Sequence, residues 1–388
     1  MTKKRPHSPV GGDTGAVGDS GGGGDSGGGA DPPASLFPAD ALPGPDALPV
    51  PGAAHREPAV DVSKCESESK VDAGEYYAEY FGHPLVLLER VHARITAEPS
   101  HKAIVFLAGD STMDNKHYLF KGYERRCMKT GHEAKARQMA DPDVTAPATR
   151  AYNRVLEPPR MVRDIAFHLS DLAPEGVCAL NCAVEESTID ERATGLLAHD
   201  EFIRDHLTAD DYVIVSMGGN DLALKPTPAT IINLLSLARA PDCTVGMQYL
   251  EWLFHHRIEE TVGRMVAGAH KPKKVLVCMM YYLDERSGGS WADRVLAAFG
   301  YDVEPAKLQQ IISTLFDHIN ARGFSVDGTQ VEAFPMFRVL DGKDTADYVQ
   351  RVEPSVQGGR KLASALVDAL FPDARDHPPA RLVTTAAT

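Results

Sequence analysis

Two apolar runs in this chain each end in a turn of small and polar residues, and this arrangement constrains the fold most. The run 103–108 leads into Gly-Asp-Ser at 109–111, and the run 213–217 leads into Gly-Gly-Asn-Asp at 218–221. Continuous apolar runs are typical of strands that are buried on both faces of a sheet. Ligands of open α/β folds bind at the carboxyl ends of such strands. The pattern therefore predicts that the serine and the asparagine of these turns share one crevice.

Strands and helices are expected to alternate along the rest of the chain. Further strands are predicted at 177–180 and 274–280, and short ones at 324–326 and 331–334. Alternation of this kind indicates βαβ units and a parallel sheet. We therefore predict a three-layer α/β/α fold with a mostly parallel five-stranded sheet. Helices are expected at 161–172, 196–207, 228–238, 245–269, 308–321 and 358–370.

Composition divides the 388 residues into a folded part and two tails. Residues 11–29 contain eleven glycines, and residues 31–60 are rich in proline and alanine. Such segments bury too little apolar surface to offset the entropy lost on ordering. We predict a disordered tail over 1–71, one α/β domain over 72–372 and a C-terminal tail over 373–388.

Charge and hydropathy make several classes of function poor fits. The formal net charge is −14, and the only basic block is at residues 3–5, so phosphate-directed nucleic-acid binding is not expected. No apolar run approaches the roughly 20 residues that cross a bilayer, so no membrane partner is expected. No apolar segment follows the N-terminal basic residues, and the six cysteines are scattered. These features predict a cytoplasmic protein with reduced thiols.

The two turns, together with Pro-Ser at 354–355 and the Gly-Gly pair at 358–359, resemble motifs of the SGNH (GDSL-like) hydrolase family. The resemblance covers residues from about 100 to 372. It implies a flavodoxin-like fold and hydrolysis of an ester, with Ser111 as the nucleophile. The backbone N–H of Ser111 and the side-chain amide of Asn220 would then stabilise the oxyanion.

The chain departs from the family pattern at the base. The family's last block reads Asp-x-x-His-Pro-Ser, whereas residues 350–355 read Gln-Arg-Val-Glu-Pro-Ser, so both triad partners of the serine are missing. Glu353 could replace the histidine if burial raises its pKa. It could instead orient the following helix or pair with a nearby arginine. Glu186 stands where the family has a glycine that lines the oxyanion hole, so that hole is altered too.

Other residues of the two turns are expected to support the site. Asp110 and Asp221 would brace their loops, while Asp114, Gly218 and Gly219 would line the crevice with them. These carboxylates and the two glutamates could attract Mg²⁺ or Ca²⁺, but their spacing matches no metal motif, so no metal or cofactor is expected. A base recruited from His117, His255 or His256 is a further alternative.

Three functions remain open from the sequence. The first is an SGNH-type esterase that hydrolyses a small-molecule or carbohydrate ester, with weak activity on generic esters because the histidine is missing. The second is a catalytically silent relative that binds a ligand in the same crevice. The third is a transferase in the same fold. The sequence leaves the substrate and the oligomeric state open.

Overall fold

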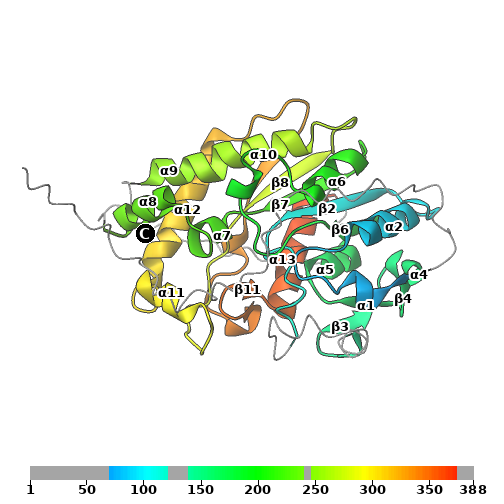
Figure 1. Cartoon of the computed structure of the whole chain (residues 1–388), viewed down its shortest axis with the longest axis horizontal. Coiled ribbons are helices and arrows are strands. Elements are labelled where there is room, and N and C mark those ends of the chain that lie inside the picture. The colour runs from blue at the N-terminus through cyan, green and yellow to red at the C-terminus, as the bar shows by residue number, and fades with distance from the viewer. Residues whose placement is uncertain (1–69, 121–138, 240–245, 374–388) are drawn as a thin grey trace, which may run out of the picture. The chain divides into compact units, whose positions relative to one another are not determined.

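The structure, a computed structural model, describes residues 70–120, 139–239 and 246–373. Five parallel strands form the central sheet in the order β6-β2-β7-β8-β9 (Figure 1). This confirms the predicted α/β fold, and the order matches that of flavodoxin-like sheets. The strands are β2 (Ala103–Gly109), β6 (Val177–Asn181), β7 (Tyr212–Ser216), β8 (Lys274–Met279) and β9 (Val331–Pro335).

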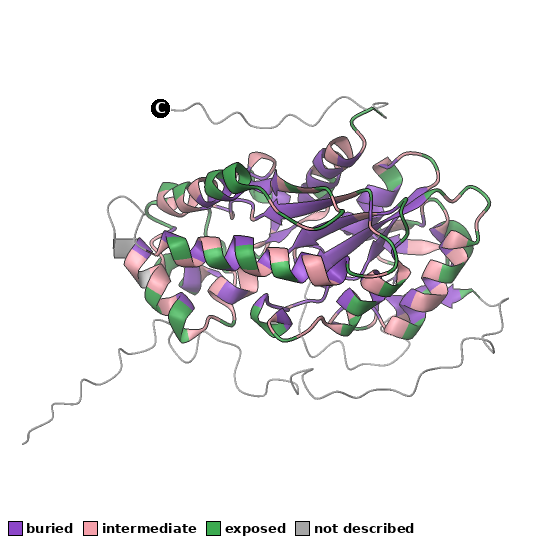
Figure 2. Ribbon diagram, turned by 90° about the horizontal axis from the view of Figure 1, so that it is seen from above, coloured by how far each residue is buried: buried purple, intermediate pink, exposed green. Residues whose placement is uncertain are grey.

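Helices cover both faces of the sheet because the strands are apolar on both sides. Alternate residues of β2 contact different cores: Val105 and Leu107 belong to one apolar cluster, and Ile104 and Phe106 to the other. The first face packs against α5 (Ile165–Leu172) and α13 (Val356–Leu370). The second packs against α2 (Leu85–Thr96), α6 (Ala198–His206), α10 (Ile258–Met265) and α12 (Pro305–Arg322). Figure 2 shows the buried strands between helices whose outer faces are exposed.

Smaller elements connect these layers. Three short strand pairs flank the sheet: β1 (Val71–Asp72) with β4 (Leu156–Glu157), β3 (Thr145–Pro147) with β5 (Arg160–Val162), and β10 (Tyr348–Val349) with β11 (Glu353–Pro354). The remaining α-helices are α1 (Ala73–Tyr76), α4 (Tyr152–Val155), α7 (Gly219–Ala223), α8 (Pro228–Arg239), α9 (Met247–Glu251) and α11 (Asp293–Ala298). Single turns form η3 (Asp190–Arg192), η5 (Met336–Arg338) and η6 (Thr345–Asp347), and η4 (Trp252–Arg257) is a π-helix.

The predicted elements differ from the observed ones in three places. The helix expected over 161–172 begins only at Ile165, where Asp164 caps α5 by accepting from Phe167 N, and the residues before it form the strand β5, which pairs with β3. Residues 324–326 do not form a strand, because Phe324 stacks on the His255 ring and Ser325 N donates to Glu259 at 2.6 Å instead of pairing with a neighbouring strand. The helix expected over 245–269 consists of α9, the π-helix η4 and α10 in succession. The predicted tails lie almost wholly outside the described residues. None of the described helices is long and apolar enough to cross a membrane.

Two glycines set the edge at which β2 and β7 end. Gly109 has φ +123°, and a Cβ there would lie 1.6 Å from Ser216 O of the neighbouring strand. Gly218 has φ +114°, and its Cβ would lie 2.4 Å from the Phe254 ring. Only glycine tolerates both the left-handed backbone and such close approach. These glycines therefore allow the two turns that follow to lie at one edge of the sheet.

Candidate active site

Ser111 lies in the tight turn that follows β2. Asp114 N donates to Asp110 O at 3.0 Å, and Asp110 Oδ1 accepts from Thr112 N at 3.2 Å. The side chain of Asp110 thus braces the turn, and burial raises its pKa to about 6. Ser111 itself is buried but for 8% of its surface. The strand and the braced turn together fix the position of its hydroxyl.

Glu353 reaches the same point from β11. The hairpin between β10 and β11 turns through Gln350 and Arg351, whose φ angles are +52° and +68°. Asn115 Nδ2 donates to Pro354 O at 2.8 Å and so ties this hairpin to the segment after Ser111. Ser355 then caps α13 by accepting from Gly358 N. Glu353 therefore sits on a short strand that is held at both ends.

Ser111 and Glu353 form a direct hydrogen bond. Ser111 Oγ donates to Glu353 Oε1 at 2.8 Å, and Glu353 Oε2 has no hydrogen-bond partner among the described residues. Burial raises the pKa of Glu353 to about 8; the Ser111 hydrogen bond opposes this shift, and the charges of Asp110 and Asp114 add to it. A carboxyl group with such a pKa can take up and release a proton near neutral pH. The pair therefore has the contact and the acidity that a nucleophile and its base require.

Glu185 is a second buried carboxyl group at this site. Burial, and next the charge of Glu353, hold its pKa well above the usual range, and its Oε2 has no partner among the described residues. Two neighbouring carboxylates in one buried site cannot both ionise readily. Glu353, whose pKa is raised to about 8, accepts the hydrogen bond from Ser111 Oγ, which favours its ionised form. The sequence analysis did not identify Glu185 as a site residue, because the family pattern pointed to its neighbour Glu186.

A buried ion pair lies next to Ser111 and Glu353, which are called the dyad from here on. Lys116 Nζ binds Asp114 Oδ1, and both side chains are essentially inaccessible to solvent. Asp114 Oδ2 accepts from Gly82 N at 3.0 Å and from Glu185 N at 3.3 Å. The expectation that Asp114 lines the crevice is wrong, because these contacts turn its carboxylate into the protein. Its role is to hold the backbone of Glu185 and the turn of Ser111.

Asn220 comes from α7, the short helix that follows Gly218. Its Nδ2 donates to Ser187 O at 3.0 Å, and Ser187 Oγ donates to Gly109 O at 2.8 Å. The amide is therefore oriented by a chain that leads back to the end of β2. A primary amide carries two N–H groups, so one remains beyond this bond. Asn220 and Gly219 both line the cavity that Ser111 faces.

Glu186 adopts a conformation that favours glycine. Its φ is +58°, in the left-handed region that residues with a side chain rarely occupy. The carboxylate lines the cavity and accepts from Tyr80 OH at 3.0 Å. Lys225 Nζ donates to Glu186 O at 3.0 Å. These contacts fix a side chain at a backbone position where the family that the sequence resembles has glycine.

Asp221 and Gly218 lie outside the cavity lining, contrary to expectation. Asp221 accepts from Ile189 N at 2.9 Å and Asp190 N at 3.1 Å, and burial raises its pKa to about 6. It braces the loop after β6. Gly218 packs against the Phe254 ring.

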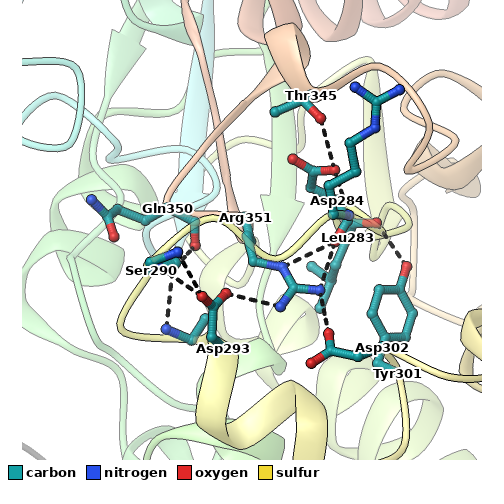
Figure 3. Close-up of polar contacts among 12 residues, drawn as sticks. Leu283, Asp284, Ser290, Asp293, Tyr301, Asp302, Thr345, Gln350 and Arg351 are labelled. Atoms are coloured by element: carbon teal, nitrogen blue, oxygen red, sulfur yellow. Dashed lines mark hydrogen bonds and ion pairs between the residues drawn. The ribbon is translucent and has the colours of Figure 1, made fainter.

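Arg351 anchors the hairpin that carries Glu353 (Figure 3). Its guanidinium donates to Asp293 Oδ1 and Asp302 Oδ1, each at 2.9 Å, and to Asp284 O at 3.1 and 3.2 Å. Ser290 Oγ donates to Gln350 O on the same hairpin. One expectation from the sequence was that Glu353 pairs with a nearby arginine, but Arg351 binds these aspartates instead.

No histidine occurs among the described residues that line the cavity. His117 Nε2 contacts Glu79 O at 2.8 Å, and burial lowers its pKa to about 3. His255 contacts Gly323 O, and His256 pairs with the exposed Glu260. Over the ranges that the structure describes, no group of three or more His, Cys, Asp or Glu side chains is placed to hold a metal ion.

The cavity has a volume of about 860 Å³ and two chemically different parts. The dyad end comprises Ser111, Glu353, Asn220, Glu185 and Glu186. The apolar arm is a part that the sequence did not reveal, and it leads away between α8, α9 and α12. It is lined by Leu234, Leu237, Leu250, Leu308, Ile312 and Leu315.

Comparison with known proteins gives structural similarity only. No family model and no curated protein matches the chain. Similar solved structures include Est24, a carbohydrate acetylesterase from Sinorhizobium meliloti, at 16% identity and a TM-score of 0.37 over 70% of this chain and 99% of that one. An aryl esterase from M. smegmatis shares 16% identity, covers 70% and 99%, and has a TM-score of 0.35. A putative GDSL-like lipase from Parabacteroides merdae shares 11%, covers 71% and 98%, and has a TM-score of 0.31. These values are too low for the activities of those enzymes to be transferred.

Proposed function

We propose that this protein is an SGNH-type serine esterase in which Glu353 replaces the usual histidine as the base. The observation that carries this proposal is the 2.8 Å hydrogen bond from Ser111 Oγ to Glu353 Oε1 in a buried site. Nucleophile and base lie within the reach that proton transfer needs. The substrate is an ester, and the products are a carboxylic acid and an alcohol.

The reaction proceeds in two halves. Ser111 Oγ attacks the acyl carbon while its proton moves to Glu353, and the protonated Glu353 then gives that proton to the leaving alcohol. A water molecule next transfers a proton to Glu353 as it attacks the acyl-enzyme. Departure of Ser111 Oγ with that proton releases the acid. Each half returns Glu353 to its ionised form, so one carboxylate serves both.

The oxyanion would be stabilised by two donors, the backbone N–H of Ser111 and the side-chain amide of Asn220. The hydrogen bond to Ser187 O holds the Asn220 amide in place before substrate binds. A donor that is already oriented costs no reorganisation in the transition state. The neutral amide also avoids adding charge to a site that already holds several carboxyl groups.

Labelling with a fluorophosphonate probe tests this proposal on the full chain. The probe should modify Ser111, labelling should be lost in Ser111→Ala, and it should be at least about 100-fold slower in Glu353→Gln. Ser236→Ala, which removes a hydroxyl on α8 outside the cavity lining, is the control and should label normally. Absence of labelling in the wild-type protein at pH 9 would refute the esterase and favour a silent ligand-binding protein.

A further inference from the structure

The apolar arm continues directly from the dyad end within one cavity. On α12, Leu308, Ile312 and Leu315 recur at the spacing that places side chains on one face of a helix. Leu234 and Leu237 of α8 and Leu250 of α9 line the same cavity, and Figure 1 shows these helices gathered at one side of the sheet. The arm is thus formed by side chains from three helices.

Several polar and charged groups lie at the dyad end of the cavity, whereas Glu304 and Lys307, the other charged residues of its lining, come from the start of α12. Asp110, Glu185 and Glu186 lie with the dyad, together with the hydroxyl groups of Tyr80 and Tyr118. A molecule that fits both parts needs a hydrocarbon chain on one side of its reacting bond and a polar group on the other. An acetyl group is too small to occupy the arm, whereas 860 Å³ falls in the range of about 300–1,000 Å³ that is usual for ligand pockets.

We infer that the substrate is an ester of a long-chain fatty acid, and that its acyl chain lies in the apolar arm. This inference rests on the proposed function for the bond that is cleaved. The acyl carbon would be attacked at Ser111, so the chain attached to it would extend between α8, α9 and α12. The polar alcohol would face Glu186 and the tyrosines. Cleavage breaks the bond between the acyl carbon and the alcohol oxygen, and water supplies the hydroxyl of the released fatty acid.

Hydrolysis of p-nitrophenyl esters of increasing chain length tests the inference. Burial of one methylene group in the arm should raise kcat/KM about fourfold, so the dodecanoyl ester should exceed the acetyl ester by well over 100-fold. Leu308→Trp and Leu234→Trp fill the arm and should each lower the dodecanoyl-to-acetyl ratio at least tenfold. Gln310→Trp and Ile232→Trp are matched controls on the exposed faces of the same helices and should keep the ratio. An acetyl ester that is hydrolysed as well as the dodecanoyl ester would overturn the inference.

Two further experiments are needed. One separates this inference from the proposed function, and the other tests whether the acyl chain or the alcohol of the ester lies in the apolar arm. The fluorescent fatty acid cis-parinaric acid should bind full-length Ser111→Ala, and adding Leu308→Trp should weaken binding at least tenfold. If the fatty acid binds in this way but the wild-type protein has no esterase activity, the proposed function fails and the fatty-acyl site in the apolar arm stands. If short esters are hydrolysed but cis-parinaric acid does not bind, the fatty-acyl site is refuted and the proposed function stands. A preference for dodecyl acetate over ethyl dodecanoate would overturn the acyl assignment.

Discussion

The dyad end and the apolar arm of the cavity are stabilised in different ways. At the dyad end, each functional side chain follows a strand or a tight turn and is oriented by hydrogen bonds, as with Asn220 and Ser187. The apolar arm is formed by leucine and isoleucine side chains that pack without directional bonds. A small displacement at the dyad end therefore affects proton transfer, whereas the arm tolerates changes in shape as long as its volume remains. The comparison indicates that reaction and substrate choice can be altered separately.

The largest expected effect comes from the two buried carboxyl groups at the dyad end. Glu353→Gln should lower kcat/KM by about 10²–10⁴-fold, because the amide cannot accept the Ser111 proton. Glu185→Gln should lower it less than about tenfold, because burial and the charge of Glu353 raise the pKa of Glu185 and so favour its neutral form, which the amide resembles. Steady-state kinetics of both variants with p-nitrophenyl butyrate give the comparison. Equal losses in the two variants would mean that the carboxyl groups act as one unit rather than as base and neighbour.

A smaller effect is expected on stability in the apolar arm. Leu315 is 1% exposed, so Leu315→Ala should lower the free energy of unfolding by about 2–3 kcal/mol, near the low end for leucine because the site already borders a cavity. Urea unfolding measures this change. Leu308→Ala, at a less buried position on the same helix, should cost less. A loss of 5 kcal/mol or more would show that the side chain is fully packed and that the arm is closed.

At the dyad end a substitution should raise stability, whereas Leu315→Ala in the apolar arm should lower it. The folded-state pKa of Glu353 is about 8, whereas the unfolded value is about 4.3. Below about pH 4.3 both states are protonated; between these values only the folded state holds the proton, so its stability falls by about 1.4 kcal/mol per pH unit as pH rises. Glu353→Gln removes this loss and should become increasingly more stable than the wild type from pH 5 to pH 8. Urea unfolding at several pH values would contradict the assignment if the difference did not change with pH.

The fold was predictable because its strands carry an unambiguous signal. The apolar runs before Gly109 and Gly218 are short and end in turns of glycine and polar residues, which is typical of buried strands. Their parallel pairing brings the two turns to one edge. The placement of Glu353 followed from its position just before Pro-Ser. The short segment 324–326 was predicted wrongly, because three apolar or small residues do not distinguish a strand from a loop that packs on a ring.

The arm and the second carboxyl group were not predictable for a physical reason. Glu185 and Glu186 are adjacent, and only the left-handed backbone at Glu186 determines where each side chain lies. The leucines of α8, α9 and α12 look like the core face of any amphipathic helix. Whether such a face packs tightly or leaves a cavity depends on how distant segments meet, which no local pattern records.

The pH dependence of fluorophosphonate labelling at Ser111 tests the Ser111–Glu353 dyad most directly. The rate should rise about tenfold per pH unit below pH 7 and level off above about pH 8, because only ionised Glu353 accepts the serine proton. Glu353→Gln should abolish this inflection together with most of the rate. An inflection near pH 6.5 that persists in Glu353→Gln would show that a histidine is the base and would contradict the account.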